Sequence, residues 1–270
     1  MTSQSPVKRY HPHRQWHTKS KPTSRPQSNV GLIVTEDLEI ATTKCRDRVR
    51  AIATECKAKN RKYRDYDWDL LVDRELCLQG CSGGADIAQG ILADPDVPQL
   101  NPPDVLRVSN IFDNPEFFKD GCSSSDIEQG ALGDCWFLSA LSTVATVKGL
   151  LDRICVERDE DAGVYGFIFF RDGKWVEVIV DDMLFVRNPR FSDLEPNQKA
   201  LYHNNPDLYN ATSRKGSKSL YFARSRTEGE TWVPLIEKAY AKLHGDYASL
   251  DGGFANEGIE DLTGYETYLV

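Results

Sequence analysis

One cysteine of the chain lies where its thiol would become nucleophilic. Cys135 follows a loop that contains Gly130 and Gly133, and the apolar run from Trp136 onward predicts a helix. A free thiol is mostly protonated at neutral pH, whereas the unpaired N–H groups and the positive dipole end of a helix N-terminus favour the thiolate. The glycines allow the backbone turn that brings the sulfur to this position. Cys135 is therefore a candidate nucleophile for attack on a carbonyl.

The same loop carries a candidate for stabilising the oxyanion that such an attack creates. Gln129 lies six residues before Cys135, and its side-chain amide can act as a donor beside the Cys135 backbone N–H. The alternative is that Cys135 is a small buried hydrophobe, as most intracellular cysteines are. That alternative does not account for Gln129, the two glycines and Asp134 together.

Residues 129–137 closely resemble the cysteine-nucleophile motif of the calpain family of papain-like proteases. Other stretches resemble family blocks in family order, and the resemblance extends from about residue 36 to residue 264; these stretches are 55–65, 107–118, 175–182, 232–242 and 260–264. The resemblance implies an α+β, mainly helical fold: the Cys-bearing lobe of a papain-like cysteine protease with a small β-hairpin. It also implies an endopeptidase that performs limited proteolysis of intracellular proteins, with Cys135 as nucleophile and Gln129 as oxyanion donor.

The resemblance further implies a calcium site and therefore calcium-dependent activity. In calpains whose protease core binds calcium, the positions of Asp126, Glu230 and Gly121 supply ligands, together with the carbonyl at the position of Lys119. Carboxylate and carbonyl oxygens suit Ca²⁺, and ligands from distant segments would make the site a clamp. The alternative is that Asp126 and Glu230 are ordinary surface acids or helix N-terminal charges.

A cysteine protease of this class also needs a histidine as general base and an asparagine or similar group to orient it. The resemblance places both in a second half of the protease core, and the motifs that carry them do not occur in the sequence. None of the five histidines is expected to substitute; they are His11, His13, His17, His203 and His244. We therefore expect a chain truncated before these residues and nearly inactive alone, with a second lobe or regulatory domains as partners. The alternatives are a noncatalytic calcium-responsive binding module and a redox-sensing thiol protein.

Composition narrows the class of protein. With 270 residues, of which 40% are hydrophobic, the chain can bury a sizeable core. No apolar run approaches the ~20 residues that span a bilayer, and no apolar signal segment begins the chain, so we expect a cytoplasmic protein. Residues 1–30 carry six Lys or Arg and no Asp or Glu, so with a net charge of −8 for the whole chain the remaining 240 residues sum to about −14. This acidic body argues against nucleic acid as the main ligand and leaves protein substrates as the expected partners. The alternative for the basic tail is that it contacts anionic lipid, nucleic acid or an acidic partner, or serves as a transit peptide. The seven cysteines lack paired spacing, so reduced thiols are expected, with zinc at Cys77 and Cys81 a remote alternative.

The chain divides into four predicted segments. These are a disordered basic tail (1–35), an initial helix with a following loop (36–105), the catalytic lobe (106–264) and a divergent end (265–270). Periodicity predicts helices over 36–60, from Cys135, over 147–155 and over 232–243, and a hairpin of 164–170 with 175–180. Residues 188–218 show little periodicity and indicate a surface insertion, either a disordered segment or a docking loop.

Overall fold

The computed structural model describes residues 31–79, 100–119 and 121–265. Most of the predicted basic tail, most of the predicted loop before residue 105, Cys81 and residues 266–270 lie outside these ranges. The predicted tail boundary at residue 35 is wrong. Leu32 is buried, and the Ile33 backbone N–H donates a hydrogen bond to the Thr263 carbonyl at 2.8 Å. Residues 31–35 therefore belong to the packed body.

The centre of the fold is a three-stranded antiparallel sheet in the order β3-β4-β5 (Cys155–Asp159, Val164–Arg171 and Lys174–Asp181). The predicted hairpin is confirmed, because β4 and β5 pair along their whole length. Asp172 and Gly173 connect them with φ of 52° and 78°, as a type I′ turn requires. The predicted helix over 147–155 is wrong in extent: α5 covers only Leu151–Ile154, and the chain enters β3 at Cys155.

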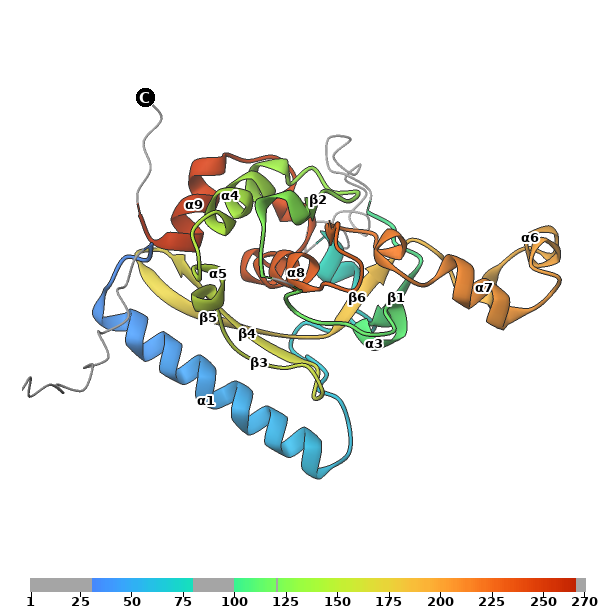
Figure 1. Ribbon diagram of the computed structural model, residues 1–270, viewed down its shortest axis with the longest axis horizontal. Coiled ribbons are helices and arrows are strands. Elements are labelled where there is room, and N and C mark those ends of the chain that lie inside the picture. The colour runs from blue at the N-terminus through green and yellow to red at the C-terminus, as the bar shows by residue number, and fades with distance from the viewer. Residues whose placement is uncertain (1–30, 80–99, 120, 266–270) are drawn as a thin grey trace, which may run out of the picture.

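Helices cover both faces of this sheet (Figure 1). On one face lies the predicted initial helix, α1 (Glu36–Ala58), which buries Leu38, Ala41, Cys45 and Val49 at helical spacing. On the other lie α4 (Cys135–Ala145), α8 (Trp232–His244) and α9 (Ala255–Thr263), so the α+β, mainly helical prediction holds. A Cβ atom on Gly166 of β4 would lie 2.6 Å from Cys45 Sγ, so the glycine permits the close approach of α1.

Two short antiparallel pairs complete the body. Strand β1 (Asp104–Arg107), which leads into α3 (Val108–Ile111), pairs with β6 (Met183–Val186). Strand β2 (Ile127–Glu128) pairs with β7 (Arg224–Ser225) and joins the loop before Cys135 to the segment before α8. Short 3₁₀ turns lie at Ser124–Asp126 (η1), Phe191–Asp193 (η2), Ser217–Ser219 (η3) and Ala248–Leu250 (η4). In the part of the chain described, no helix is long and apolar enough to cross a membrane.

Residues 188–218 form an arm that projects from the body (Figure 1), and the expectation of a disordered segment is wrong. The arm contains α6 (Pro196–Leu201) and α7 (Pro206–Ser213), each with proline at its first position, where the missing N–H costs nothing. Three aromatic rings pack together in the arm: the ring centroid of Tyr209 lies 5.8 Å from that of Phe191 and 4.9 Å from that of Tyr202. Whether the arm is an insertion relative to the family stays a prediction.

A buried carboxylate holds the base of the arm. Asp104 of β1 accepts hydrogen bonds from Arg190 at the start of the arm and from Arg214 at its end, the closer contacts measuring 3.1 Å and 2.5 Å. Burial opposes ionisation of Asp104, but the two guanidinium groups hold its pKa below the usual value. The same acid thus fastens both ends of the arm to the body.

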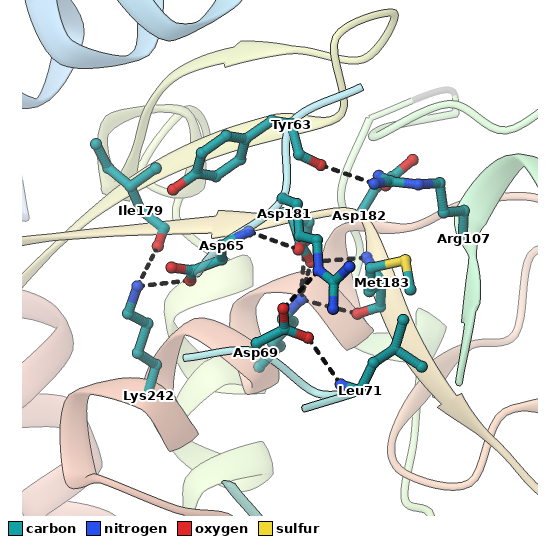
Figure 2. Close-up of polar contacts among 12 residues, drawn as sticks. Tyr63, Asp65, Asp69, Leu71, Arg107, Ile179, Asp181, Asp182, Met183 and Lys242 are labelled. Atoms are coloured by element: carbon teal, nitrogen blue, oxygen red, sulfur yellow. Dashed lines mark hydrogen bonds and ion pairs between the residues drawn. The ribbon is translucent and has the colours of Figure 1, made fainter. Parts of the chain in front are cut away.

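A second buried ionic network joins α8 to the end of β5. Lys238 has no exposed surface, and its Nζ donates to Asp181 Oδ1 at 2.5 Å, to the Asp181 carbonyl at 3.1 Å and to the Met183 carbonyl at 2.8 Å. Figure 2 shows the adjoining contacts: Asp65 donates its N–H to Asp181 Oδ2 at 2.9 Å, and Lys242 donates to Asp65 Oδ2 at 2.5 Å. Three distant segments therefore meet around these charges.

Replacing Lys238 by methionine should strongly destabilise the fold, because it leaves Asp181 buried without its counter-charge. We expect a loss of about 3–5 kcal/mol in the free energy of unfolding, measured by urea denaturation at neutral pH. Burial opposes ionisation of Asp181, but Lys238 lowers its pKa, so the pair stabilises the fold above the usual Asp pKa and ceases to do so as pH falls through the lowered value. The cost of Lys238→Met should therefore shrink in acid.

The matched control is Lys218→Met, because Lys218 is exposed. Its effect should stay within about 0.5 kcal/mol. A Lys238→Met variant as stable as this control would show that the buried pair does not hold α8 to the sheet.

Candidate active site

Cys135 is the first residue of α4, and its side chain is exposed while the next three residues are buried. The thiol opens into a surface hollow of about 350 Å³. Gln129 lines the same hollow, so the structure brings the two predicted catalytic residues together; the other lining residues are Ser124, Ile127, Leu138, Ser139 and Ser142. A thiol at the start of a packed helix is held in place yet accessible to a reactant.

The Gln129 side chain is oriented by its own loop. Its Nε2 donates a hydrogen bond to the Leu132 carbonyl at 2.6 Å. A primary amide carries two N–H bonds, so one remains for an oxygen of a reactant. The oxyanion role of Gln129 stays a prediction, and this geometry is compatible with it.

Residues from the C-terminal third of the chain fix the loop before Cys135. The Ala131 N–H donates to the Tyr221 carbonyl at 3.0 Å, and the Gly252 N–H donates to the Gly133 carbonyl at 3.1 Å. On the helix itself, Trp136 Nε1 donates to the Leu250 carbonyl at 2.8 Å. The loop and the start of α4 are thus held from two sides.

Gly130 is required because the loop passes directly over another backbone. A Cβ atom on Gly130 would lie 2.1 Å from the carbonyl carbon of Phe222. Phe222 cannot easily retreat, since its ring stacks on Tyr247 with centroids 3.9 Å apart. The predicted need for glycine here therefore has a steric cause in addition to backbone freedom.

A buried carboxyl pair that the sequence analysis missed lies beneath Cys135. Asp134 has no exposed surface, and its carboxyl contacts that of Glu237 on α8, which is 1% exposed. Burial raises the pKa of Asp134 to about 6 and that of Glu237 well above its usual value. The available signal was Glu237 itself, an acid within the apolar run of the helix over 232–243.

The four predicted calcium ligands lie on two neighbouring segments. Glu230 is buried, and its carboxylate accepts hydrogen bonds from the Lys119 N–H at 3.0 Å and from the Ser225 hydroxyl. Burial raises the pKa of Glu230, and the negative charge of Asp126 adds to that shift, so the two carboxylates are near enough to interact. Gly121 is exposed, with a φ of 93°.

Asp126 has one side-chain hydrogen-bond partner in its own turn and one on the segment before α8. Its Oδ2 accepts from the Ser123 N–H at 3.0 Å, and its Oδ1 accepts from the Thr227 hydroxyl at 3.4 Å. No cluster of three or more His, Cys, Asp or Glu side chains suited to a metal occurs within the described ranges. The predicted calcium site has only two carboxylates, and its other ligands are backbone oxygens, so the absence of such a side-chain cluster does not test it. Calcium binding stays a prediction.

Neither histidine in the described parts of the chain lines the hollow at Cys135. His244 lies at the end of α8, where it contacts Arg171 at 2.9 Å and Asp261 at 3.4 Å. His203 lies between α6 and α7 on the projecting arm. The other three histidines lie outside the described residues.

Comparison with known proteins decides the family. The family model of calpain family cysteine proteases matches residues 88–270, which is more than half of the chain. The chain belongs to the calpain family of cysteine proteases. This confirms the resemblance drawn from the sequence motifs and the fold class that it implied.

Individual calpains agree with this assignment. The chain is 34% identical to "Calpain clp-4" of Caenorhabditis elegans over 215 residues, covering 74% of the chain and 25% of that protein. It is 39% identical to a calpain of Schistosoma mansoni over 164 residues, covering 58% and 18%. It is 35% identical to the calpain-1 catalytic subunit of Bos taurus over 162 residues, covering 58% and 19%. The chain thus spans a quarter or less of the length of these relatives.

Substituting Gly130 by alanine should displace the loop before Cys135, because the new methyl group meets backbone that stacking holds in place. We expect a loss of about 1–3 kcal/mol in the free energy of unfolding, as for other overpacking substitutions. We also expect a changed rate of Cys135 alkylation by iodoacetamide, followed by peptide mass spectrometry. Ala131→Ser is the control, since Ala131 is exposed on the same loop. Equal behaviour of the two variants would remove the steric argument.

Proposed function

We propose that this calpain-family chain supplies the nucleophile-bearing lobe of a calcium-dependent cysteine endopeptidase that performs limited proteolysis of cytoplasmic proteins. The observation that carries the proposal is the exposed thiol of Cys135 at the first position of a helix whose next three residues are buried, in a hollow shared with Gln129. The family assignment supports the reaction class.

In the proposed reaction, the Cys135 thiolate attacks the carbonyl carbon of a peptide bond. The electrons of the carbonyl π bond move to its oxygen, where the Cys135 N–H and the free N–H of Gln129 stabilise the negative charge. Collapse of this intermediate forms a thioester on Cys135 and expels the amine, which takes up a proton, and water then hydrolyses the thioester.

The proton of the Cys135 thiol must pass to a general base and on to the leaving amine. No described histidine lines the hollow, so we assign the base and its orienting group to a second lobe that would face this one. Protein substrates would then bind between the two lobes. Which proteins are substrates would then depend on the surfaces of both lobes.

Calcium would be held by the carboxylates of Asp126 and Glu230 and the carbonyls of Lys119 and Gly121. The donor set fits, since all four ligands are hard oxygens and a cation would offset the cost of burying Glu230 next to another carboxylate. When bound, the ion would neutralise these charges. The residues themselves join the segment before η1 to the start of α8, and β2 and β7 connect that junction to the Cys135 loop.

An observation also favours a second function, the noncatalytic calcium-responsive binding module. No described histidine shares the hollow with Cys135. A lobe that bound calcium without a general base beside the thiol would respond to the ion and hydrolyse nothing. The two functions separate in one assay. A catalytic lobe gains turnover when a calpain second lobe is added, whereas a binding module shows calcium-dependent stabilisation and no turnover under any condition.

Turnover of a fluorogenic peptide should require Cys135 and, to a lesser extent, Gln129. With a calpain second-lobe polypeptide added, we expect Cys135→Ala to abolish turnover and Gln129→Ala to lower kcat by about 10²- to 10³-fold, with a small effect on KM. Ser142→Ala, in the same hollow, should leave both nearly unchanged. Persistent turnover in Cys135→Ala would rule out this nucleophile, and turnover by the chain alone would rule out the assignment of the base to a second lobe.

Calcium should raise the thermal unfolding midpoint of the chain, and Asp126→Asn or Glu230→Gln should remove that rise. At a concentration 100 times Kd, binding to the folded state alone stabilises by about 2.7 kcal/mol. Asp113→Asn is the control, because the side chain of Asp113 is 84% exposed and lies outside the predicted set. The calcium site would be disproved by an unchanged midpoint in the native chain or by a full response in both variants.

A further inference from the structure

Two buried carboxyls meet where α4 begins against α8. Asp134 immediately precedes Cys135 and occupies the N-cap position of α4, but its side chain makes no capping hydrogen bond. Glu237 lies in the middle of α8. Both are almost fully removed from solvent, with 0% and 1% exposure. Buried acids are rare in proteins unless they are paired, so this contact needs a physical explanation.

The described residues around the pair provide a hydrogen-bond donor for Glu237 but none for Asp134. Both oxygens of Glu237 lie near the Ala223 N–H, at 3.1 Å and 3.0 Å. Among the described residues, neither oxygen of Asp134 has a donor of acceptable geometry outside the pair. Its carboxyl instead contacts that of Glu237. Two ionised carboxylates carry only acceptors, so this contact becomes a hydrogen bond only when one of them is protonated.

No positive charge near the pair would support two negative ones. Neither acid forms an ion pair within the described ranges, and the ammonium of the neighbouring Lys238 is bound to Asp181. Asp251, after η4, faces Asp134 and adds a further negative charge, while its Oδ1 accepts the Gly133 N–H at 3.1 Å. Tyr247 faces Glu237 as a neutral phenol, its pKa raised by burial. The thiol of Cys135 is next along the chain. The Ala223 N–H supports one negative charge on the pair, and the neighbouring charges oppose a second.

We propose that Asp134 and Glu237 share one proton, and that this hydrogen bond is the positioning contact that holds the start of α4, and with it Cys135, against α8. Asp134 and Glu237 are positioning residues that act through Cys135. The shared proton itself is independent of the proposed peptidase function, whereas its consequence for catalysis rests on Cys135 being the nucleophile. The pair also keeps a single negative charge beside the thiol at neutral pH.

The first test is the pH dependence of stability. Both pKa values are raised in the folded chain, so the folded state holds protons that the unfolded state releases, and stability falls as pH rises above the usual carboxyl range. For each such proton, the folding equilibrium constant falls by up to roughly tenfold per pH unit. In Glu237→Gln, a permanent amide N–H takes the place of the shared proton, so one of these contributions disappears.

We therefore expect Glu237→Gln to fold and to show a shallower loss of stability between about pH 5 and pH 8.5 than the native chain, measured by urea denaturation across pH. Glu39→Gln is the control, since Glu39 is exposed on α1, and it should keep the native profile. The proposal is overturned if Glu237→Gln follows the native profile, or if it fails to fold, because an amide donor should then substitute for the proton.

The second test measures how the charge of the pair affects the reactivity of Cys135. Glu237→Gln keeps one negative charge on Asp134, whereas the double variant Asp134→Asn with Glu237→Gln keeps none. Iodoacetamide alkylation of Cys135 across pH, followed on its own peptide by mass spectrometry, should match the native chain near neutral pH in the single variant. In the double variant it should be about three- to tenfold faster, because removing a nearby negative charge favours the thiolate, which is the form that reacts.

A double variant with the native alkylation profile would show that the pair places no charge near the thiol, and would overturn that part of the proposal. These outcomes are distinct from failure of the proposed peptidase function, which is read from turnover in Cys135→Ala. If the chain shows the expected pH profiles but no turnover, the shared proton is supported and only its consequence for catalysis is refuted.

Discussion

The fold depends on burying one ammonium group correctly. An unpaired charge in a protein interior costs several kcal/mol, so Lys238 is tolerable only where Asp181 and two backbone carbonyls surround it. That requirement seats α8 at the end of β5. With α8 in place, Tyr240 stacks on Phe137 of α4 at 3.8 Å between ring centroids. The position of the thiol on α4 thus follows from a buried contact on the neighbouring helix, α8.

Local signals were enough for the main elements. The initial helix, the helix at Cys135, the hairpin turn at Asp172 and the helix ended by Gly245 were predictable because periodicity, caps and turn residues act within a few positions. Strand β3 was not, since its short charged sequence becomes a strand only beside β4. The arm was missed because its two short helices depend on aromatic rings and on both arginines at Asp104, none of which follows a helical period.

The residues of the candidate site likewise differ in whether local sequence could predict them. Cys135 and Gln129 share one loop, so a family motif could identify them from sequence. The contact between Asp134 and Glu237 joins residues far apart in the chain and required the packing of α4 on α8 to be known. The predicted calcium residues are intermediate: the pairing of β2 with β7 brings Asp126 near Glu230, and sequence alone could suggest that only through resemblance.

The supports of the Cys135 loop also set an order of events during synthesis. Gly133 is held by Asp251, 118 residues further along the chain, and Trp136 is held by the Leu250 carbonyl, 114 residues further along. During synthesis, Cys135 emerges from the ribosome long before these supporting residues do. Contacts between residues so distant in sequence also form late, because a long loop must close first. The nascent cysteine therefore lies in an unfolded segment, and it acquires its fixed setting at the start of α4 only when the polypeptide through Gly252 has emerged.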